Sequence, residues 1–236
     1  MHNLIKHISV DWLQINCRYI EPIGSFVPDG MILKLQDYQT KHFKKVWILY
    51  NNTMDEVATF ACEPHSSILK ANMVLLKINN KFLYNTNLWE FSQTIVEGMK
   101  LIAISITRLD VAADFCEFNN TYNPEKFIFD FLQQKIYKTG KAKFSVFGET
   151  NRRKKTKLRS NYLRFGSETS EVSYYLYNKS IELDQVKNKP YIRELWDNIG
   201  LDKKKDKWRL EFSIKSNLKA AIEEETAEYI CNLNNL

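Results

Sequence analysis

Turn residues divide the first third of this sequence into short β-rich segments, and this pattern limits the folds open to the chain. The segments are VDWLQINC, MILKLQ, FKKVWILY, EVATFACE, NMVLLKI and KFLY, with NNT and NNK between some of them. β-Branched and aromatic residues favour strands, whereas clusters of Asn mark turns. We therefore expect antiparallel strands up to about residue 84.

A helix and a long strand are predicted next. Residues 87–100 (NLWEFSQTIVEGMK) carry one apolar helical face, and Asn87 with Glu90 three residues later resembles a capping box. Residues 101–115 (LIAISITRLDVAADF) are long and apolar, with β-branched residues at their start. This composition favours a central strand.

The remaining pattern mixes helices with strands. A second helix is expected to begin with Asn123 as N-cap and Pro124 in its first turn, and to end at Gly140. The elements expected after it are the strands AKFSVFG, NYLRFGS and VSYYLYNK, the helix PYIRELWDNIG, the strand KWRLEFSIK and a helical stretch at 217–231. Several strands in succession favour an α+β fold, a curved antiparallel sheet with helices packed on one face, over a doubly wound parallel sheet. A duplicated α+β unit would account for the order of elements.

Composition excludes several classes of protein. The chain has 236 residues, 44% hydrophobic and 26% charged, which suffices for a core and excludes disorder. No apolar run approaches the roughly 18 to 20 residues that span a bilayer, and the N-terminus lacks a signal-peptide pattern. We expect a cytoplasmic protein with no membrane partner. The cysteines are scattered singly, which excludes a CxxC zinc pair and predicts buried thiols: Cys17, Cys62, Cys116 and Cys231.

Positive charge gathers in one part of the chain. The net charge is +6, from 34 Lys+Arg against 28 Asp+Glu. A stretch without an acidic residue contains Arg152, Arg153, Lys154, Lys155, Lys157, Arg159 and Arg164. Such a run is either a solvated loop or a set of phosphate contacts on nucleic acid, whose binding would weaken steeply with salt.

Alternation divides three late strands into an apolar and a polar side. The apolar sides are Leu109, Val111, Ala113 and Phe115; Val172, Tyr174 and Leu176; and Trp208, Leu210, Phe212 and Ile214. The polar sides are Arg108, Asp110 and Asp114; Ser173, Tyr175, Tyr177 and Lys179; and Lys207, Arg209, Glu211 and Ser213. We expect the apolar sides to face the core and the polar sides to face away from it.

If these strands are neighbours in one sheet, their polar sides supply the chemistry of a phosphodiester site. Asp110, Asp114 and Glu211 offer oxygen ligands for Mg²⁺ or Mn²⁺. Positive charge for the phosphate would come from Arg108, Arg209 and Lys179. A tyrosine hydroxyl could attack and form a covalent phosphotyrosine. The alternative is an ordinary solvated sheet face with cross-strand ion pairs.

The order of several segments resembles a known family. The segments are VDWLQINC, ITRLDVAADF, YLRFGSETSEVSYYLYNKSIEL, PYIRELW and WRLEFSI. From about Val10 to about Lys215 the chain resembles the Rep_trans replication initiation proteins of staphylococcal-type rolling-circle plasmids, a family that includes conjugative-element relaxases and phage initiators. The most specific part of the resemblance is Gly166-Ser167, Ser170, Tyr177-Asn178-Lys179 and Glu182.

This resemblance implies a metal-dependent, topoisomerase-like enzyme that nicks and closes double-stranded origin DNA and acts as a homodimer. A tyrosyl-DNA link would leave a 3′-OH to prime synthesis. The family's R-x-Y-x-K strand matches Tyr177 as nucleophile and Lys179, but Tyr175 replaces the arginine and is the alternative nucleophile. The acidic strand matches Asp110 and Asp114, and the late R-x-E strand matches Arg209 and Glu211.

The chain is expected to divide into a catalytic domain at residues 1–216, which the resemblance implies, and a C-terminal helix at 217–236, which the sequence pattern predicts. Family members often continue further, so the ending CNLNNL is interpreted either as a natural short form or as a truncation.

Other classes fit the sequence less well. Endonucleases with paired metal-binding histidines need two closely spaced histidines, which His2, His7, His42 and His65 do not provide. No GxxxxGK[ST] phosphate loop is present, so unwinding would need a separate helicase. The remaining alternatives are a non-cutting origin-binding protein of a mobile element and a scaffold protein with an incidental basic loop.

Overall fold

The computed structural model describes residues 7–85, 87–118, 122–136, 143–150, 158–167, 169–185 and 189–216. These residues fall into two compact units. Unit 1 contains residues 7–9 and 110–214, and unit 2 contains residues 10–109 and 215–216.

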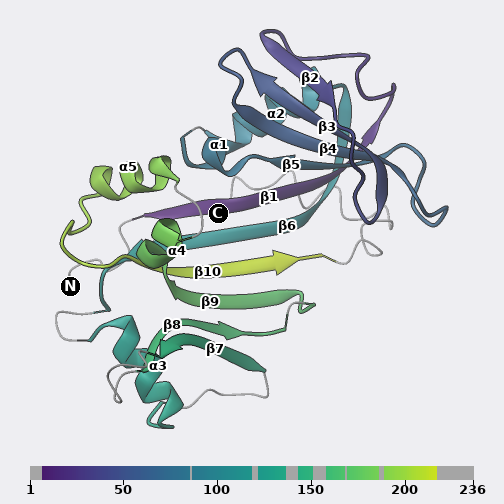
Figure 1. The fold of residues 1–236 in the computed structure, drawn as a ribbon. Coiled ribbons are helices and arrows are strands. Elements are labelled where there is room, and N and C mark those ends of the chain that lie inside the picture. Colours follow the sequence, from purple (N-terminus) through teal and green to yellow (C-terminus); the bar gives the residue numbers. More distant parts are fainter. Residues whose placement is uncertain are drawn as a thin grey trace. The chain divides into compact units, whose positions relative to one another are not determined.

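The described residues form ten strands and five helices (Figure 1). The strands are β1 (Ile8–Tyr19), β2 (Met31–Leu35), β3 (Phe43–Asn51), β4 (Glu56–Pro64), β5 (Met73–Ile78), β6 (Leu101–Phe115), β7 (Phe144–Thr150), β8 (Leu158–Phe165), β9 (Val172–Asn178) and β10 (Trp208–Lys215). The helices are α1 (Asn80–Asn85), α2 (Leu88–Gly98), α3 (Pro124–Leu132), α4 (Lys179–Gln185) and α5 (Pro190–Asn198).

The strands are hydrogen-bonded in the order β2-β3-β4-β5-β1-β6-β10-β9-β8-β7. Consecutive strands pair antiparallel in both units, as β3 does with β4 and β8 with β9. The predicted α+β class with an antiparallel sheet is therefore confirmed. None of the helices in the described part of the chain has the length and apolar character that crossing a membrane requires.

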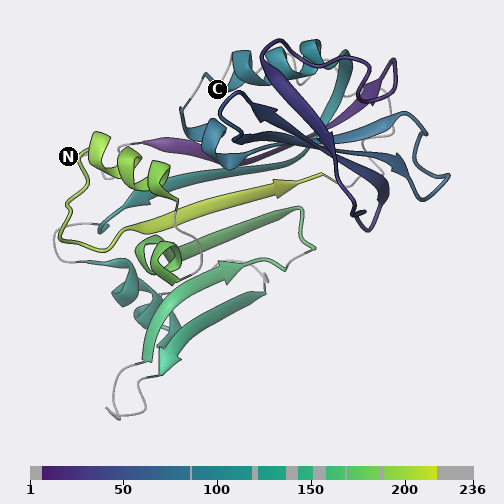
Figure 2. The ribbon, with the colours of Figure 1, turned by 45° about the horizontal axis from the view of Figure 1, so that its top comes forward.

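Each unit has its own hydrophobic core. In unit 2, Cys17 of β1, Phe60 of β4 and Leu76 of β5 belong to one buried cluster with Ile95 of α2. In unit 1, Ile128 of α3 packs against Leu163 of β8 and Leu176 of β9. α3 lies beside β7 and β8 in both ribbon views (Figures 1 and 2).

The polar sides of β9 and β10 are partly buried, whereas the sequence predicts that they face away from the core; Tyr175, Tyr177 and Glu211 on these sides are part-exposed. Ser173, Arg209 and Ser213 have no exposed surface. The reason is that unit 1 covers both faces of these strands: α3 packs on the apolar side, and side chains of α4 and α5 reach the polar side.

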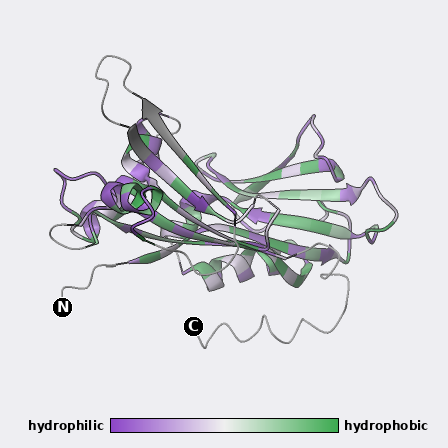
Figure 3. Ribbon diagram, turned by 90° about the horizontal axis from the view of Figure 1, so that it is seen from below, coloured by the Kyte–Doolittle hydropathy of each residue, from purple (hydrophilic) through white to green (hydrophobic). Residues whose placement is uncertain are grey.

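The apolar sides are also only partly as predicted. Leu176 and Trp208 are buried, but the far ends of the same two strands expose four apolar side chains: Val172, Tyr174, Phe212 and Ile214. Tyr174 and Phe212 are cross-strand partners whose rings pack edge to face at 5.0 Å between centroids. Figure 3 shows hydrophobic and hydrophilic residues alternating along the strands. Alternation therefore predicted which residues share a side, but not which side is solvated.

Two local predictions are wrong and one is confirmed. KFLY forms most of helix α1 instead of a strand, because the Asn79 side chain accepts a hydrogen bond from the Lys81 amide and starts a helical turn. Asn87 precedes α2 but makes no capping hydrogen bond, so the capping box is absent. Asn123 does cap α3, accepting from the Lys126 amide at 2.8 Å.

The later helices differ in how well the sequence predicts them. The helix from Pro190 is confirmed as α5, whereas α4 was not predicted. The helix expected to run to Gly140 ends at Leu132, because the backbone leaves the helical conformation at Gln134, which has φ 57°. Gly140 itself and the expected helical stretch at 217–231 lie outside the described residues.

The order of elements repeats, as a duplicated unit would require. Each unit has a run of antiparallel strands followed by two helices and another strand: β5-α1-α2-β6 in the first case and β9-α4-α5-β10 in the second. The neighbours differ, however, since β5 lies beside β1, whereas β9 lies beside β10. Duplication stays a hypothesis.

Candidate functional site

The register of three strands in unit 1 brings the candidate nucleophiles together. Tyr177 lies opposite Arg209 on β10 and opposite Tyr162 on β8. Tyr175 lies opposite Glu211 on β10 and opposite Arg164 on β8. The condition stated for the sequence, that the strands around Asp110, Tyr177 and Arg209 are neighbours in one sheet, is met by the order β6-β10-β9.

A glycine turn sets this register between β8 and β9. Gly166 has φ +91°, a backbone conformation that residues with a side chain rarely adopt. A Cβ there would also lie 3.0 Å from the Val172 carbonyl oxygen, so the space for a side chain is too small. The Ser167 amide donates to Ser170 Oγ at 2.9 Å, and Ser173 Oγ donates to the Ser167 carbonyl at 3.1 Å. The serines therefore stabilise the turn.

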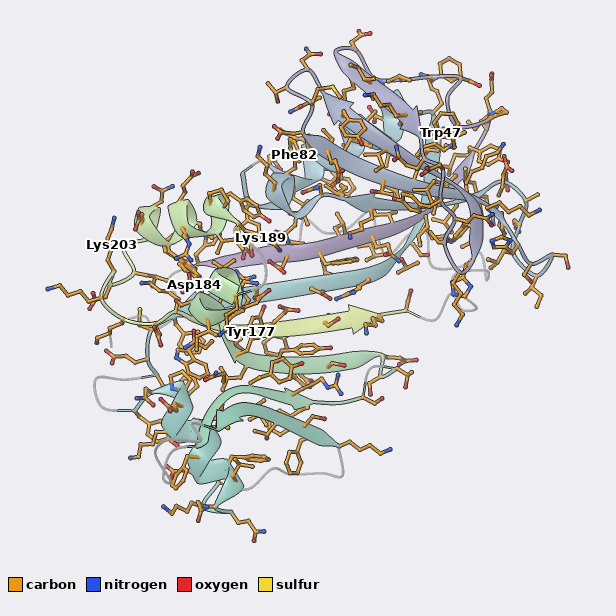
Figure 4. The ribbon with its side chains drawn as sticks, in the orientation of Figure 1. Trp47, Phe82, Tyr177, Asp184, Lys189 and Lys203 are labelled. Carbon is orange, nitrogen blue, oxygen red and sulfur yellow. The ribbon has the colours of Figure 1, made fainter. Side chains whose placement is uncertain are left out.

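The Tyr177 hydroxyl lies between a carboxylate and an ammonium of unit 1. Its hydroxyl donates a hydrogen bond to Glu211 Oε2 at 2.9 Å and accepts one from Lys179 Nζ at 3.2 Å. Lys179 Nζ also lies 2.5 Å from Glu182 Oε2. We call Tyr177, Lys179, Glu182 and Glu211 the tyrosine cluster; Figure 4 labels Tyr177 within unit 1. A carboxylate and an ammonium on one phenol oxygen are a typical arrangement for an activated nucleophile.

Lys179 reaches Tyr177 from a helix rather than from the strand. β9 ends at Asn178, whose side chain accepts a hydrogen bond from the Ile181 amide at 3.0 Å and caps α4. The amides of Lys179 and Ser180 both donate to the Lys207 carbonyl, which ties the start of α4 to the chain just before β10. Lys179 is the first residue of α4, and its side chain is only 2% exposed.

Arg209 and Asp114 form a buried ion pair beside the tyrosine cluster's strands. Arg209 Nε donates to Asp114 Oδ1 at 2.6 Å, and Arg209 Nη2 donates to Asp114 Oδ2 at 2.7 Å. Trp196 Nε1 of α5 donates to the same Oδ2 at 2.7 Å. Arg209 is 0% exposed and Asp114 is 4% exposed. This bidentate pair joins β6, β10 and α5.

The three predicted metal ligands are not gathered into one ligand set. Asp114 uses both oxygens on Arg209 and Trp196, and Glu211 accepts from Tyr177. Asp110 is buried at 1% exposure. Within the described ranges, no three His, Cys, Asp or Glu residues are placed to hold a metal ion. Asp114 therefore does not fit the ligand role in this arrangement.

Tyr175 differs from Tyr177 in its surroundings. Its ring packs edge to face on Tyr162 with 6.1 Å between centroids. Tyr162 also contacts the Tyr177 ring at 6.1 Å, so the three rings lie together. The ammonium and carboxylate contacts of the tyrosine cluster belong to Tyr177.

The predicted cations belong to two different units. Arg108 belongs to unit 2, where its Cζ lies 4.1 Å from the Trp12 ring, with Lys77 Nζ at 3.6 Å from the same ring. Arg164 is part-buried on β8. The side chains of the remaining basic stretch lie outside the described residues: Arg152, Arg153, Lys154, Lys155, Lys157 and Arg159.

Glu182 has no role in the sequence prediction beyond its place in a motif. A signal for its role was present: Asn178 is a favoured N-cap residue, and a helix that begins after it puts Glu182 three residues beyond Lys179, on the same side of the helix. Trp196 had no comparable signal, because its contact with Asp114 depends on tertiary packing.

Comparison with known proteins gives a clear result for structure alone. No family model matches the chain, and no curated protein sequence matches it. Among solved structures, the chain is similar to the rolling circle replication initiator protein from Geobacillus stearothermophilus, with a TM-score of 0.55 and 15% identity. The match covers 95% of this chain and 78% of that one. At this identity the comparison shows a shared fold.

Proposed function

We propose that this chain is a replication initiation protein that nicks and rejoins origin DNA for rolling-circle replication, with Tyr177 as nucleophile. The observation that carries the proposal is the Tyr177 hydroxyl held between Glu211 and Lys179. The shared fold with a rolling circle initiator supports it. The Rep_trans resemblance in the sequence points to the same tyrosine.

In this proposal each partner of Tyr177 has a role. Because the hydroxyl donates to Glu211 Oε2, this carboxylate is placed to accept the proton as the phenol oxygen attacks phosphorus. Lys179 donates to the same oxygen and stabilises its developing negative charge. The new bond joins the Tyr177 oxygen to phosphorus, and the bond from phosphorus to the 3′ oxygen breaks.

The reaction is reversible because the phosphodiester is exchanged and not hydrolysed. The departing 3′ oxygen takes a proton from water and becomes the 3′-OH that primes synthesis. The 5′ phosphate stays on Tyr177 until a 3′-OH attacks it and restores the phenol. Nicking and closing therefore use the same groups in opposite directions.

Arg209 takes a supporting role in this proposal. Its guanidinium lies on Asp114 in a buried pair, away from solvent. Arg209 therefore fixes β10, which carries Glu211 two residues later. The sequence alone predicts that Arg209 neutralises the DNA phosphate. In this proposal Arg209 instead positions the strand that carries Glu211.

The other requirements stay predictions. They are dependence on Mg²⁺ or Mn²⁺, recognition of double-stranded origin DNA, a separate helicase and a homodimer. The proposed chemistry of Tyr177 has no step through a metal, because Asp114 does not fit as a ligand. The alternative function is a DNA-binding protein that recognises an origin without cutting it.

The test is a nicking assay on a supercoiled plasmid that carries the origin of the protein's own replicon. Reactions contain Mg²⁺, Mn²⁺ or EDTA, and products are separated by denaturing electrophoresis with and without protease. We expect open circles with protein attached to the 5′ end, lost in Tyr177→Phe and retained in Tyr175→Phe. Loss only in Tyr175→Phe would transfer the nucleophile to Tyr175. Specific binding with intact supercoils in every reaction would favour the non-cutting alternative.

A further inference from the structure

We propose that Glu182 is a positioning residue that holds the Lys179 ammonium against the Tyr177 hydroxyl. This inference rests on the proposed function and deepens it. It assigns a role to a residue outside the predicted catalytic set and explains how a helix completes a site built on strands.

Two distances and the burial of Lys179 carry the inference. Lys179 Nζ lies 2.5 Å from Glu182 Oε2 and 3.2 Å from the Tyr177 hydroxyl oxygen. The Lys179 side chain is 2% exposed, whereas the Glu182 side chain is 35% exposed. An ammonium removed from water needs a compensating charge or hydrogen bonds. Glu182 supplies that charge through Oε2, an atom that is itself buried and whose contact with Lys179 is an ion pair without hydrogen-bond geometry.

The backbone of α4 explains why Glu182 is suited to this task. Asn178 caps the helix, so Lys179 and Glu182 are three residues apart in the first turn and face the same side. Lysine is a flexible point charge with several rotatable bonds. A carboxylate fixed on the same helical turn limits those rotations and points the ammonium at Tyr177. Without it, the Lys179 amine loses its closest charged partner.

The first experiment measures single-turnover formation of the tyrosyl-DNA adduct at saturating origin DNA. We expect Glu182→Gln to slow adduct formation about tenfold or more, because the charge that orients a catalytic group is removed. The DNA concentration for half-maximal rate should stay unchanged. Glu182→Asp should recover part of the rate. Asp184→Asn is the matched control, since Asp184 is on the same helix and pairs with Arg193 at the surface; Figure 4 labels it.

A double-mutant cycle separates positioning from a general structural effect. If Glu182 acts through Lys179, then Glu182→Gln should change the rate little when Lys179 is already Gln. Multiplicative losses in the double variant would overturn the proposal, because independent effects multiply. An unchanged rate in Glu182→Gln alone would overturn it as well.

A second measurement works without DNA cleavage and keeps the two proposals distinguishable. The protein is labelled with 3-fluorotyrosine, and the Tyr177 fluorine resonance is assigned by its loss in Tyr177→Phe. Glu182→Gln should shift this resonance, and Asp184→Asn should leave it in place. A shift in a protein that never forms adducts would uphold the positioning of Lys179 while the nicking function fails. An unmoved resonance would remove the positioning role even if Tyr177 proves to be the nucleophile.

Discussion

Arg209 and Asp114 hold three elements of unit 1 together through charges that water does not reach. The pair has two hydrogen bonds between its members and a third from Trp196. Removing one partner leaves the other charge buried and uncompensated, which typically costs about 3–5 kcal/mol. We therefore expect Asp114→Ala to lower the free energy of unfolding by about that amount in urea denaturation.

The control for this variant is an exposed ion pair whose acidic member lies on the same helix as Trp196. Asp197 pairs with Lys203 at 2.9 Å, and their side chains are 52% and 77% exposed. Such pairs contribute about 0–1 kcal/mol, so Asp197→Ala should hardly move the urea midpoint. Equal losses from the two substitutions would show that the Arg209–Asp114 pair is no more important than a surface pair.

The reactivity of two buried cysteines in unit 2, Cys17 and Cys62, can also be predicted residue by residue. Burial raises the pKa of Cys17 to about 12 and that of Cys62 to about 11. A raised pKa means that thiolate appears only as the pH rises toward that value, so at pH 8 about one Cys62 side chain in a thousand is ionised. We expect both thiols to resist iodoacetamide at pH 8 in the folded protein and to react in urea. Peptide mass spectrometry of a Cys231→Ser variant measures this, and rapid labelling of Cys62 without urea would contradict its burial.

Two asparagines before helices provide a comparison at the scale of single elements. Asn123 caps α3 with a hydrogen bond from the Lys126 amide, whereas Asn87 before α2 makes no such bond. Replacing a functional N-cap by alanine costs about 0.5–2 kcal/mol. Asn123→Ala should therefore destabilise unit 1 by about 1 kcal/mol, and Asn87→Ala should cost clearly less. Urea unfolding of the two variants measures the difference, and a larger effect at Asn87 would contradict the assigned caps.

Local sequence signals predicted secondary structure correctly where the residues of a single helix or strand determine its conformation. The strand at residues 101–115, the cap at Asn123 and the helix from Pro190 all follow from propensity and turn chemistry. KFLY failed because a short segment of apolar and aromatic residues fits a strand or a helix equally well by pattern. The Asn79 side chain, outside that segment, decides between them.

The candidate site was predictable in its residue types more than in its contacts. Alternation placed Tyr177, Arg209 and Glu211 on one side of two strands, and the register confirms that they share it. The burial of Arg209 depends on Asp114 and Trp196, which come from β6 and α5. A pattern within one strand carries no information about what another element places over it, so the buried pair could not be foreseen.

At the scale of the whole molecule, strand neighbours such as β6 and β10 are far apart in sequence. The sequence therefore predicted the fold class and the antiparallel pairing, while the strand order required the structure. Net charge is also a property of the whole molecule, and it follows from the sequence alone: the chain has a net charge of +6 and a pI near 9.0. A basic protein that neutralises DNA phosphates loses affinity as salt rises, because counterions are released.

The basic stretch around residues 152–159 makes this electrostatic prediction specific. We expect replacement of Lys154 and Lys155 by Gln to weaken origin DNA binding and to reduce the slope of log affinity against log salt by about 0.9 for each phosphate that is no longer neutralised, hence by up to about 1.8. Replacing Lys41 and Lys44, exposed lysines of unit 2, removes the same charge and is the matched control. Binding isotherms at several salt concentrations measure both slopes. If the two double variants change the slope equally, the stretch contributes only through net charge and is a solvated loop; a reduced slope confined to the 154–155 variant locates DNA binding in the stretch.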